Sequence, residues 1–152
     1  MLVIVFIAIF APWLAPGDAF SSDMTKALQA PSAQHWFGTD KLGRDVLSRI
    51  IYGTQLSLFM GVSIVVIMVS IGTVIGAVAG YFGGKVEMVL MRLADIMLSF
   101  PGVVLAIAIA GILGGSIVNT ILALSVVGWA KYARLVRSMT LKVRDRKSTR
   151  LN

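Results

Sequence analysis

Residues 56–80 read LSLFMGVSIVVIMVSIGTVIGAVAG and contain no charged side chain. A helix needs about 20 apolar residues to cross the hydrocarbon core of a bilayer, and this stretch is long enough. The whole 152-residue chain is of the same kind, with 57% hydrophobic and 14% charged residues. A soluble domain could not cover so much apolar surface with so few polar side chains. The composition therefore predicts a single-domain membrane protein.

Three further apolar segments complete the predicted fold, an all-α polytopic transmembrane helix bundle. The four spans are expected at about residues 1–15, 56–80, 88–113 and 117–137. The first is shorter than a full span and contains Pro12, which favours a helix whose start has been clipped. A cleaved signal peptide is the alternative, although no basic region precedes the apolar run.

Positive charge predicts the orientation of these spans. Eight of the fourteen Lys and Arg residues lie between positions 131 and 150, which places that segment in the cytoplasm. Alternation then puts the N-terminus in the cytoplasm and the loop at residues 16–55 outside. Four basic residues in this loop argue mildly for the opposite orientation, but the C-terminal cluster outweighs them. Because the net charge of +7 arises mainly from a membrane flank, no nucleic-acid partner is expected.

Two of the spans carry small residues at intervals of four. These are Gly72, Gly76 and Gly80 in the second span, and Ala106, Ala110 and Gly114 in the third. Small residues at this spacing allow helix backbones to approach closely in lipid, so they are predicted helix-packing positions. The alternative is that glycine is simply common in membrane helices.

Arg92, Asp95 and Pro101 are candidate gate or pathway residues at the start of the third span. Ionisable groups at membrane depth commonly mark substrate pathways. The alternative is local pairing of Arg92 with Asp95 at the i, i+3 spacing, near the cytoplasmic end of the helix. Pro101 should break or kink the helix because it has no N–H for the hydrogen-bond ladder.

Residues 37–49 read FGTDKLGRDVLSR and form a charged block in the outer loop. Its two glycines predict tight turns. The apolar residues at 46, 47, 50 and 51 predict a short amphipathic helix on the outer membrane face, with Asp45 and Arg49 paired at i, i+4. His35 has no second histidine or cysteine nearby, so it is expected to be interfacial and not a metal ligand.

No catalytic constellation is visible in the sequence. There is no GxxxxGK[ST] phosphate loop and no credible Ser/His/Asp set, since the chain has a single histidine. The absence of cysteine excludes a disulfide framework and a thiolate metal site. We therefore expect a protein that is not an enzyme and has no cofactor or metal of its own.

An ordered set of motifs resembles one family of membrane proteins. The motifs are HWFGTDKLGRD at 35–45 followed by Ser48-Arg49 and Tyr52-Gly53, GYFGGK at 80–85, MRLAD at 91–95, Phe100-Pro101, and WAKYARLVRS at 129–138. Together they closely resemble the C-type inner-membrane permease of the dipeptide, oligopeptide and nickel ABC importers, over about residues 1–146.

The resemblance implies a six-helix permease that switches between inward-open and outward-open forms in a bacterial inner (plasma) membrane. Its implied partners are a sister permease subunit, two cytoplasmic ATPase subunits that carry the ATPase activity, and a periplasmic solute-binding protein. The outer loop would face the binding protein through Phe37, Gly38, Thr39, Asp40, Gly43, Arg44, Asp45 and Arg49. The four predicted spans would then be four of these six.

The end of the chain departs from the family pattern. Members continue after position 146 into a loop that docks on the ATPase, whereas residues 147–152 read KSTRLN and are expected to be a foreign tail on a fragment. Two other classes remain as alternatives, a non-transport membrane scaffold subunit and a fragment of a secondary transporter. The latter predicts midplane ionisable residues and inverted repeats, and neither is apparent.

Overall fold

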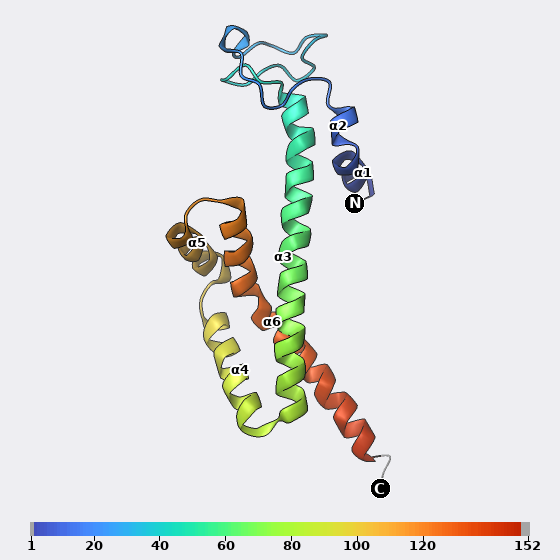
Figure 1. Cartoon of the computed structure of the whole chain (residues 1–152), viewed down its shortest axis with the longest axis vertical. Coiled ribbons are helices and arrows are strands. Elements are labelled where there is room, and N and C mark those ends of the chain that lie inside the picture. The colour runs from blue at the N-terminus through green and yellow to red at the C-terminus, as the bar shows by residue number, and fades with distance from the viewer. Residues whose placement is uncertain (1, 150–152) are drawn as a thin grey trace. The chain divides into compact units, whose positions relative to one another are not determined.

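The computed structural model describes residues 2–149, with side chains as far as Arg144. Its helices are α1 (Leu2–Ile9), α2 (Ala11–Leu14), the 3-10 turn η1 (Met24–Lys26), α3 (Val46–Phe82), α4 (Gly84–Ser99), α5 (Gly102–Leu113) and α6 (Ile117–Thr149) (Figure 1). The described residues form no strand, only an isolated bridge between Thr39 and Asp45. The predicted all-helical class is therefore confirmed.

The chain divides into two compact units, Met1–Gly61 and Val62–Asn152. The first contains α1, α2, η1, the loop and the start of α3. The second contains the rest of α3 and the three helices that follow.

Among the described residues, α3 is the one helix that is by itself long and apolar enough to cross a membrane. A second such element results if α4 and α5 are counted together as one broken span. The segment predicted as a first span forms two short helices of 8 and 4 residues. The number of four spans therefore stays a prediction.

The short amphipathic helix expected at the end of the outer loop is wrong as a separate element. Residues 46–52 form the first turns of α3, which continues without interruption to Phe82. The physical reason is that a helix, once started, adds one hydrogen bond for each further residue, and no proline follows to stop it.

The break expected at Pro101 is confirmed. α4 ends at Ser99, α5 begins at Gly102, and the two helices are bent by 91°. Pro101 has no N–H to donate and disfavours helical geometry at Phe100, whose φ and ψ are −92° and 146°. The predicted third span is therefore a broken element and not one straight helix.

Gly114 does not share a helix face with Ala106 and Ala110, as the spacing predicted. It follows the last residue of α5 with a φ of 92°, outside the helix. Ala106 is buried and Ala110 half-buried. Because α5 stops at Leu113, the third residue of the predicted series lies one position beyond the end of the helix.

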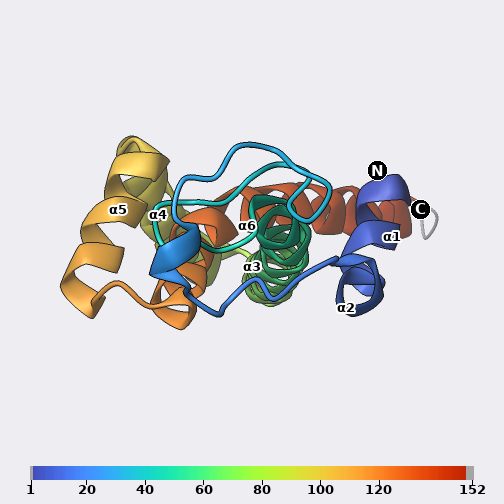
Figure 2. The same ribbon diagram turned by 90° about the horizontal axis from the view of Figure 1, so that it is seen from above.

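In the second unit, α6 packs against both α4 and α5 (Figure 1, Figure 2). Its core is made of small residues around one tryptophan: Ala94, Trp129, Ala130 and Ala133. Alanines at these positions allow the helices to approach closely, and this suits a bundle in which dispersion contacts replace the hydrophobic effect.

Three glycines of α3 lie against α6. A Cβ at Gly72 would be 2.6 Å from the Cβ of Tyr132, at Gly76 2.4 Å from the carbonyl oxygen of Ala133, and at Gly80 2.7 Å from the Cβ of Thr140. Real Cβ atoms do not approach other atoms so closely, so each position has room only for glycine as the backbones stand.

The helix α6 extends beyond the predicted boundary at 137 and remains helical through Thr149. Part of the predicted foreign tail, residues 147–149, therefore continues this helix in its backbone. Residues 150–152 lie outside the described range, and the origin of the tail stays a prediction.

Candidate functional site

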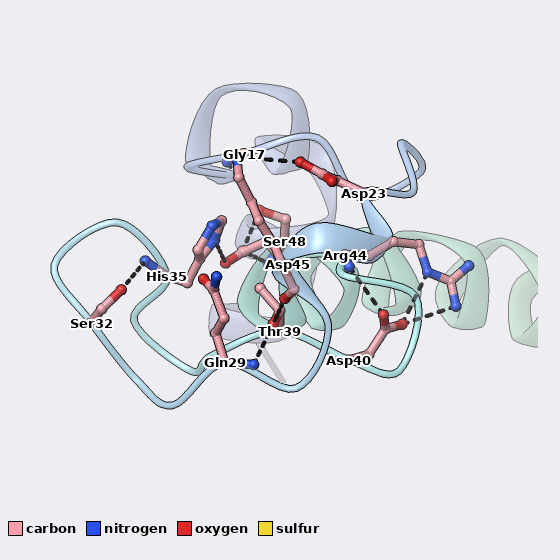
Figure 3. A network of polar contacts seen from close by, with 11 residues as sticks. Gly17, Asp23, Gln29, Ser32, His35, Thr39, Asp40, Arg44, Asp45 and Ser48 are labelled. Carbon is pink, nitrogen blue, oxygen red and sulfur yellow. Dashed lines mark hydrogen bonds and ion pairs between the residues drawn. The ribbon is translucent and has the colours of Figure 1, made fainter.

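Asp45 organises one side of the outer loop (Figure 3). Its Oδ2 accepts hydrogen bonds from the backbone N–H and the hydroxyl of Ser48, at 2.8 and 2.7 Å. Its Oδ1 lies 3.0 Å from Nδ1 of His35. Ser48 Oγ in turn accepts from the backbone N–H of Gly17 at 3.0 Å. Asp45 therefore caps the first turn of α3 and ties two distant parts of the loop to it.

Asp40 organises the other side of the loop (Figure 3). Its Oδ1 accepts from the backbone N–H groups of Leu42 and Arg44, at 2.8 and 3.0 Å. Its Oδ2 accepts from Nε of Arg44 at 2.9 Å and also pairs with Arg49. The carboxylate thus closes a tight turn and neutralises part of the charge of two guanidiniums.

These contacts shift the pKa of both carboxyl groups. Desolvation alone would raise the pKa of Asp40, but the N–H groups of Arg44 and Leu42 and the Arg44 guanidinium lower it well below its usual range. Desolvation likewise opposes the shift at Asp45, and the hydrogen bonds from Ser48 and His35 lower its pKa. Both groups are therefore carboxylates at neutral pH.

We expect the folded loop to lose stability only in acid. A carboxyl whose pKa is lower in the folded state stabilises the fold at pH values above its ordinary pKa of 3.8. That contribution decreases as the pH drops below about 4. It is lost completely once the pH has fallen below the still lower pKa of the folded state. Tryptic cleavage rates after acid incubation should be flat between about pH 8 and 5 and rise below about pH 4.

Asp40→Asn is the matched variant for this acid transition. Its amide oxygen can still accept from the two backbone N–H groups, but it cannot titrate, so the acid step should shrink. An acid step of unchanged size in Asp40→Asn would show that other groups control it.

Gly38 and Gly43 shape the turns that hold these side chains. Their φ angles are 72° and 71°, in the left-handed region that favours glycine. A Cβ at Gly38 would be 2.4 Å from the carbonyl oxygen of Gln29, and one at Gly43 only 1.8 Å from that of Asp23. Both positions therefore need glycine for conformation and for space.

Thr39 belongs, with Asp40 and Asp45, to an inner layer of the loop, the set of side chains that bond to other parts of the loop. Its hydroxyl accepts from the backbone N–H of Gln29 at 2.8 Å and donates to the carbonyl of Lys26. Of the eight predicted loop residues, four are buried and two half-buried, and the exposed ones are Phe37 and Arg49. Most of the motif therefore folds the loop, and fewer of its members face outward than the sequence suggested.

One pairing expected from the sequence is wrong, and His35 has a partner that the sequence did not predict. Asp45 does not pair with Arg49, because it is occupied by Ser48 and His35 while Arg49 contacts Asp40. The side chain of His35 is only 18% exposed and pairs with Asp45, whereas its position at the membrane interface stays a prediction. The available signal was Asp45 itself, a helix-capping residue type directly before an apolar helix.

A second charged cluster joins α4 to α6. Asp95 pairs with Arg134, and Glu87 accepts from Nε of Arg137 at 2.6 Å. The expected local pair of Arg92 with Asp95 is therefore wrong, because Asp95 turns to the neighbouring helix. Arg92 is exposed and makes no ion pair among the described residues. Sequence spacing cannot detect a pair across 39 positions.

Arg144 closes the end of α3. Its Nη1 lies 3.4 Å from the carbonyl oxygens of Gly80 and Tyr81. A cation at the C-terminal end of a helix satisfies free carbonyls and complements the helix dipole. The described residues contain no group of three or more potential metal ligands.

Comparison with known proteins identifies the family. Residues 72–150 match the family described as binding-protein-dependent transport system inner membrane component, and the chain belongs to it. The family resemblance of the sequence motifs is thereby confirmed. The chain is accordingly an inner-membrane protein of the permease class.

Three relatives illustrate the range of the similarity. The chain is 45% identical over 141 residues to the dipeptide transport system permease protein DppC of Alkalihalophilus pseudofirmus, covering 93% of this chain and 46% of the relative. It is 39% identical over 144 residues to the nickel transport system permease protein NikC of Escherichia coli K12, covering 95% and 52%. It is 43% identical over 146 residues to the glutathione transport system permease protein GsiD of Escherichia coli O6, covering 95% and 48%. The chain thus spans about half the length of the relatives it matches.

Proposed function

We propose that this chain forms part of the membrane-spanning permease of an ATP-driven importer for peptides or nickel. The observation that carries the proposal is its similarity to dipeptide and nickel permeases over 93–95% of its own length. In this proposal the chain supplies four of the spans of a six-span permease and has its N-terminus in the cytoplasm. In this proposal the permease subunit is not itself an enzyme.

The proposed assembly contains a sister permease subunit, two cytoplasmic ATPase subunits and a periplasmic solute-binding protein. ATP binding and hydrolysis on the ATPase subunits would switch the permease pair between inward-open and outward-open forms. The glycine face of α3 and the alanines of α5 would hold the bundle together during this switch.

Arg92, Asp95 and Pro101 are the proposed gate elements. The bend of 91° at Pro101 and the pairing of Asp95 with Arg134 on α6 support the assignment. A broken helix offers a place where a short segment can move without unwinding the rest. An ion pair between two helices can be exchanged for other partners when they separate.

The outer loop is the proposed contact for the solute-binding protein. Its inner layer, built on Asp40 and Asp45, would keep a constant shape, while exposed side chains such as Phe37 and Lys41 would meet the partner. A folded loop loses less conformational entropy on binding than a flexible one.

Single-cysteine labelling tests this proposal, because the chain has no cysteine of its own. Lys41→Cys in the outer loop should react with a membrane-impermeant maleimide in intact cells. Lys85→Cys, at an exposed position in the first turn of α4, should react only after permeabilisation. The reverse pattern would overturn the orientation.

The same Lys41→Cys variant can then carry a photo-crosslinker. We expect it to capture the solute-binding protein encoded beside this chain, and to do so at least about fivefold more than the Lys85→Cys control. Capture at the level of the control, or the absence of binding-protein and ATPase genes nearby, would favour a scaffold subunit instead.

A further inference from the structure

A pocket of about 620 Å³ lies beside the start of α3, within the first unit. Its lining changes character along its length. Arg44 and Arg49 form a cationic end, Phe20 and Tyr52 form an aromatic wall, and Leu56 and Phe59 form an apolar end. The rings of Phe20 and Tyr52 are in contact, with centroids 5.4 Å apart.

The cationic end has an excess of positive charge. Asp40 pairs with both guanidiniums, so one carboxylate balances two cations. Arg44 presents Nε and Nη2 to Asp40, and Arg49 presents only Nη1, so N–H donors remain on both groups. The Arg49 side chain is 45% exposed and accessible to an anion.

The pocket lies where a bilayer surface is expected. Arg49 is the last charged residue before Lys85, so the hydrocarbon region begins within a few residues of it. Arg49, Tyr52, Leu56 and Phe59 follow one face of α3 at intervals of three and four residues. From Arg49 to Phe59 this face extends about 15 Å, which is about half of a hydrocarbon core and therefore one leaflet.

We propose that this pocket binds one anionic phospholipid, with the headgroup phosphate at Arg44 and Arg49 and an acyl chain along Tyr52, Leu56 and Phe59. The ligand must have an anionic group and an apolar tail in direct succession, because the lining has these two characters in that order. Phospholipids are present in every inner membrane at this depth. The inference rests on membership of an inner-membrane family and is independent of the transported substrate.

Native mass spectrometry of the purified chain tests the proposal. The chain is incubated with equal amounts of dioleoyl phosphatidylglycerol and dioleoyl phosphatidylcholine, and retained lipid is counted for each variant. We expect about tenfold preference for phosphatidylglycerol, and Arg49→Gln should reduce it about tenfold because a charge-assisted contact is lost. Lys41→Gln is the matched control, since it removes one positive charge from the same loop without lining the pocket.

Phe59→Ala tests the apolar end without touching the loop. It should weaken retention of phosphatidylglycerol about threefold through lost acyl contact, while leaving the helical circular dichroism unchanged. Equal loss in Arg49→Gln and Lys41→Gln would reduce the effect to diffuse electrostatics and overturn the proposal. Complete displacement of the lipid by millimolar inorganic phosphate would also overturn it, in favour of a simple anion site. Displacement of the lipid by a partner subunit would likewise overturn the proposal, because that subunit would then be the occupant of the pocket.

Discussion

Gly76→Leu is expected to disrupt the packing of α3 against α6. The first added atom would lie 2.4 Å from the carbonyl oxygen of Ala133 and 2.9 Å from the Cβ of Val136. Overpacking of a close-packed interior costs about 1–3 kcal/mol, and a clash with backbone cannot be relieved by a change of rotamer. We therefore expect a loss of stability at the upper end of that range.

The measurement is the amount of intact protein in membranes, together with its half-life after synthesis stops. Co-purification with a sister permease should fall in parallel. Gly61→Leu is the matched control, since it lies on the same helix with nothing within 4 Å of its Cβ position. Equal behaviour of the two variants would remove the argument for close packing.

Gly43→Ala is expected to open the outer loop. At a φ of 71° an alanine is strained by about 1–2 kcal/mol, and its Cβ would be 1.8 Å from the carbonyl oxygen of Asp23. The clash is with backbone, so the hydrogen bond from Asp23 N–H to the carbonyl of Leu42 should be lost as well. The strain alone raises the open fraction about tenfold.

Limited trypsin cleavage after Lys26 and Lys41 measures this opening, and we expect it to be at least about tenfold faster. Gly17→Ala is the control in the same loop, because its Cβ would make ordinary contacts of 3.6 Å with Asp45 and Ser48. If cleavage of the two variants is equally slow, the loop does not depend on the left-handed turn at Gly43.

Local sequence patterns were sufficient for those features that depend on neighbouring residues. The uncharged run at 56–80 predicted the apolar part of α3, and Pro101 predicted the break between α4 and α5. In each case the cause acts within one helical turn or along one continuous segment, so spacing alone carries the information.

Such local patterns could not predict contacts between residues that are far apart in the sequence. Asp45 meets His35 across 10 positions, Ser48 meets Gly17 across 31, and Asp95 meets Arg134 across 39. Nothing in the spacing of these residues distinguishes them from exposed polar residues. The amphipathic stretch at 46–52 was misassigned because a surface helix and the start of a long helix have the same periodicity.

The broken element α4–α5 has a consequence for solvation. A helix that ends at Ser99 leaves the carbonyls of its last turn without helical partners. Within the part of the chain that the structure describes, one of them, that of Ile96, accepts a hydrogen bond from Ser99 Oγ at 2.7 Å. Acyl chains have no hydrogen-bond donors, so lipid cannot surround such a turn at low cost. Where a helix is interrupted inside a membrane, its free carbonyl groups must contact water or another part of the polypeptide. In the proposed permease, the region around Phe100 therefore needs a hydrated cavity or a neighbouring helix beside it.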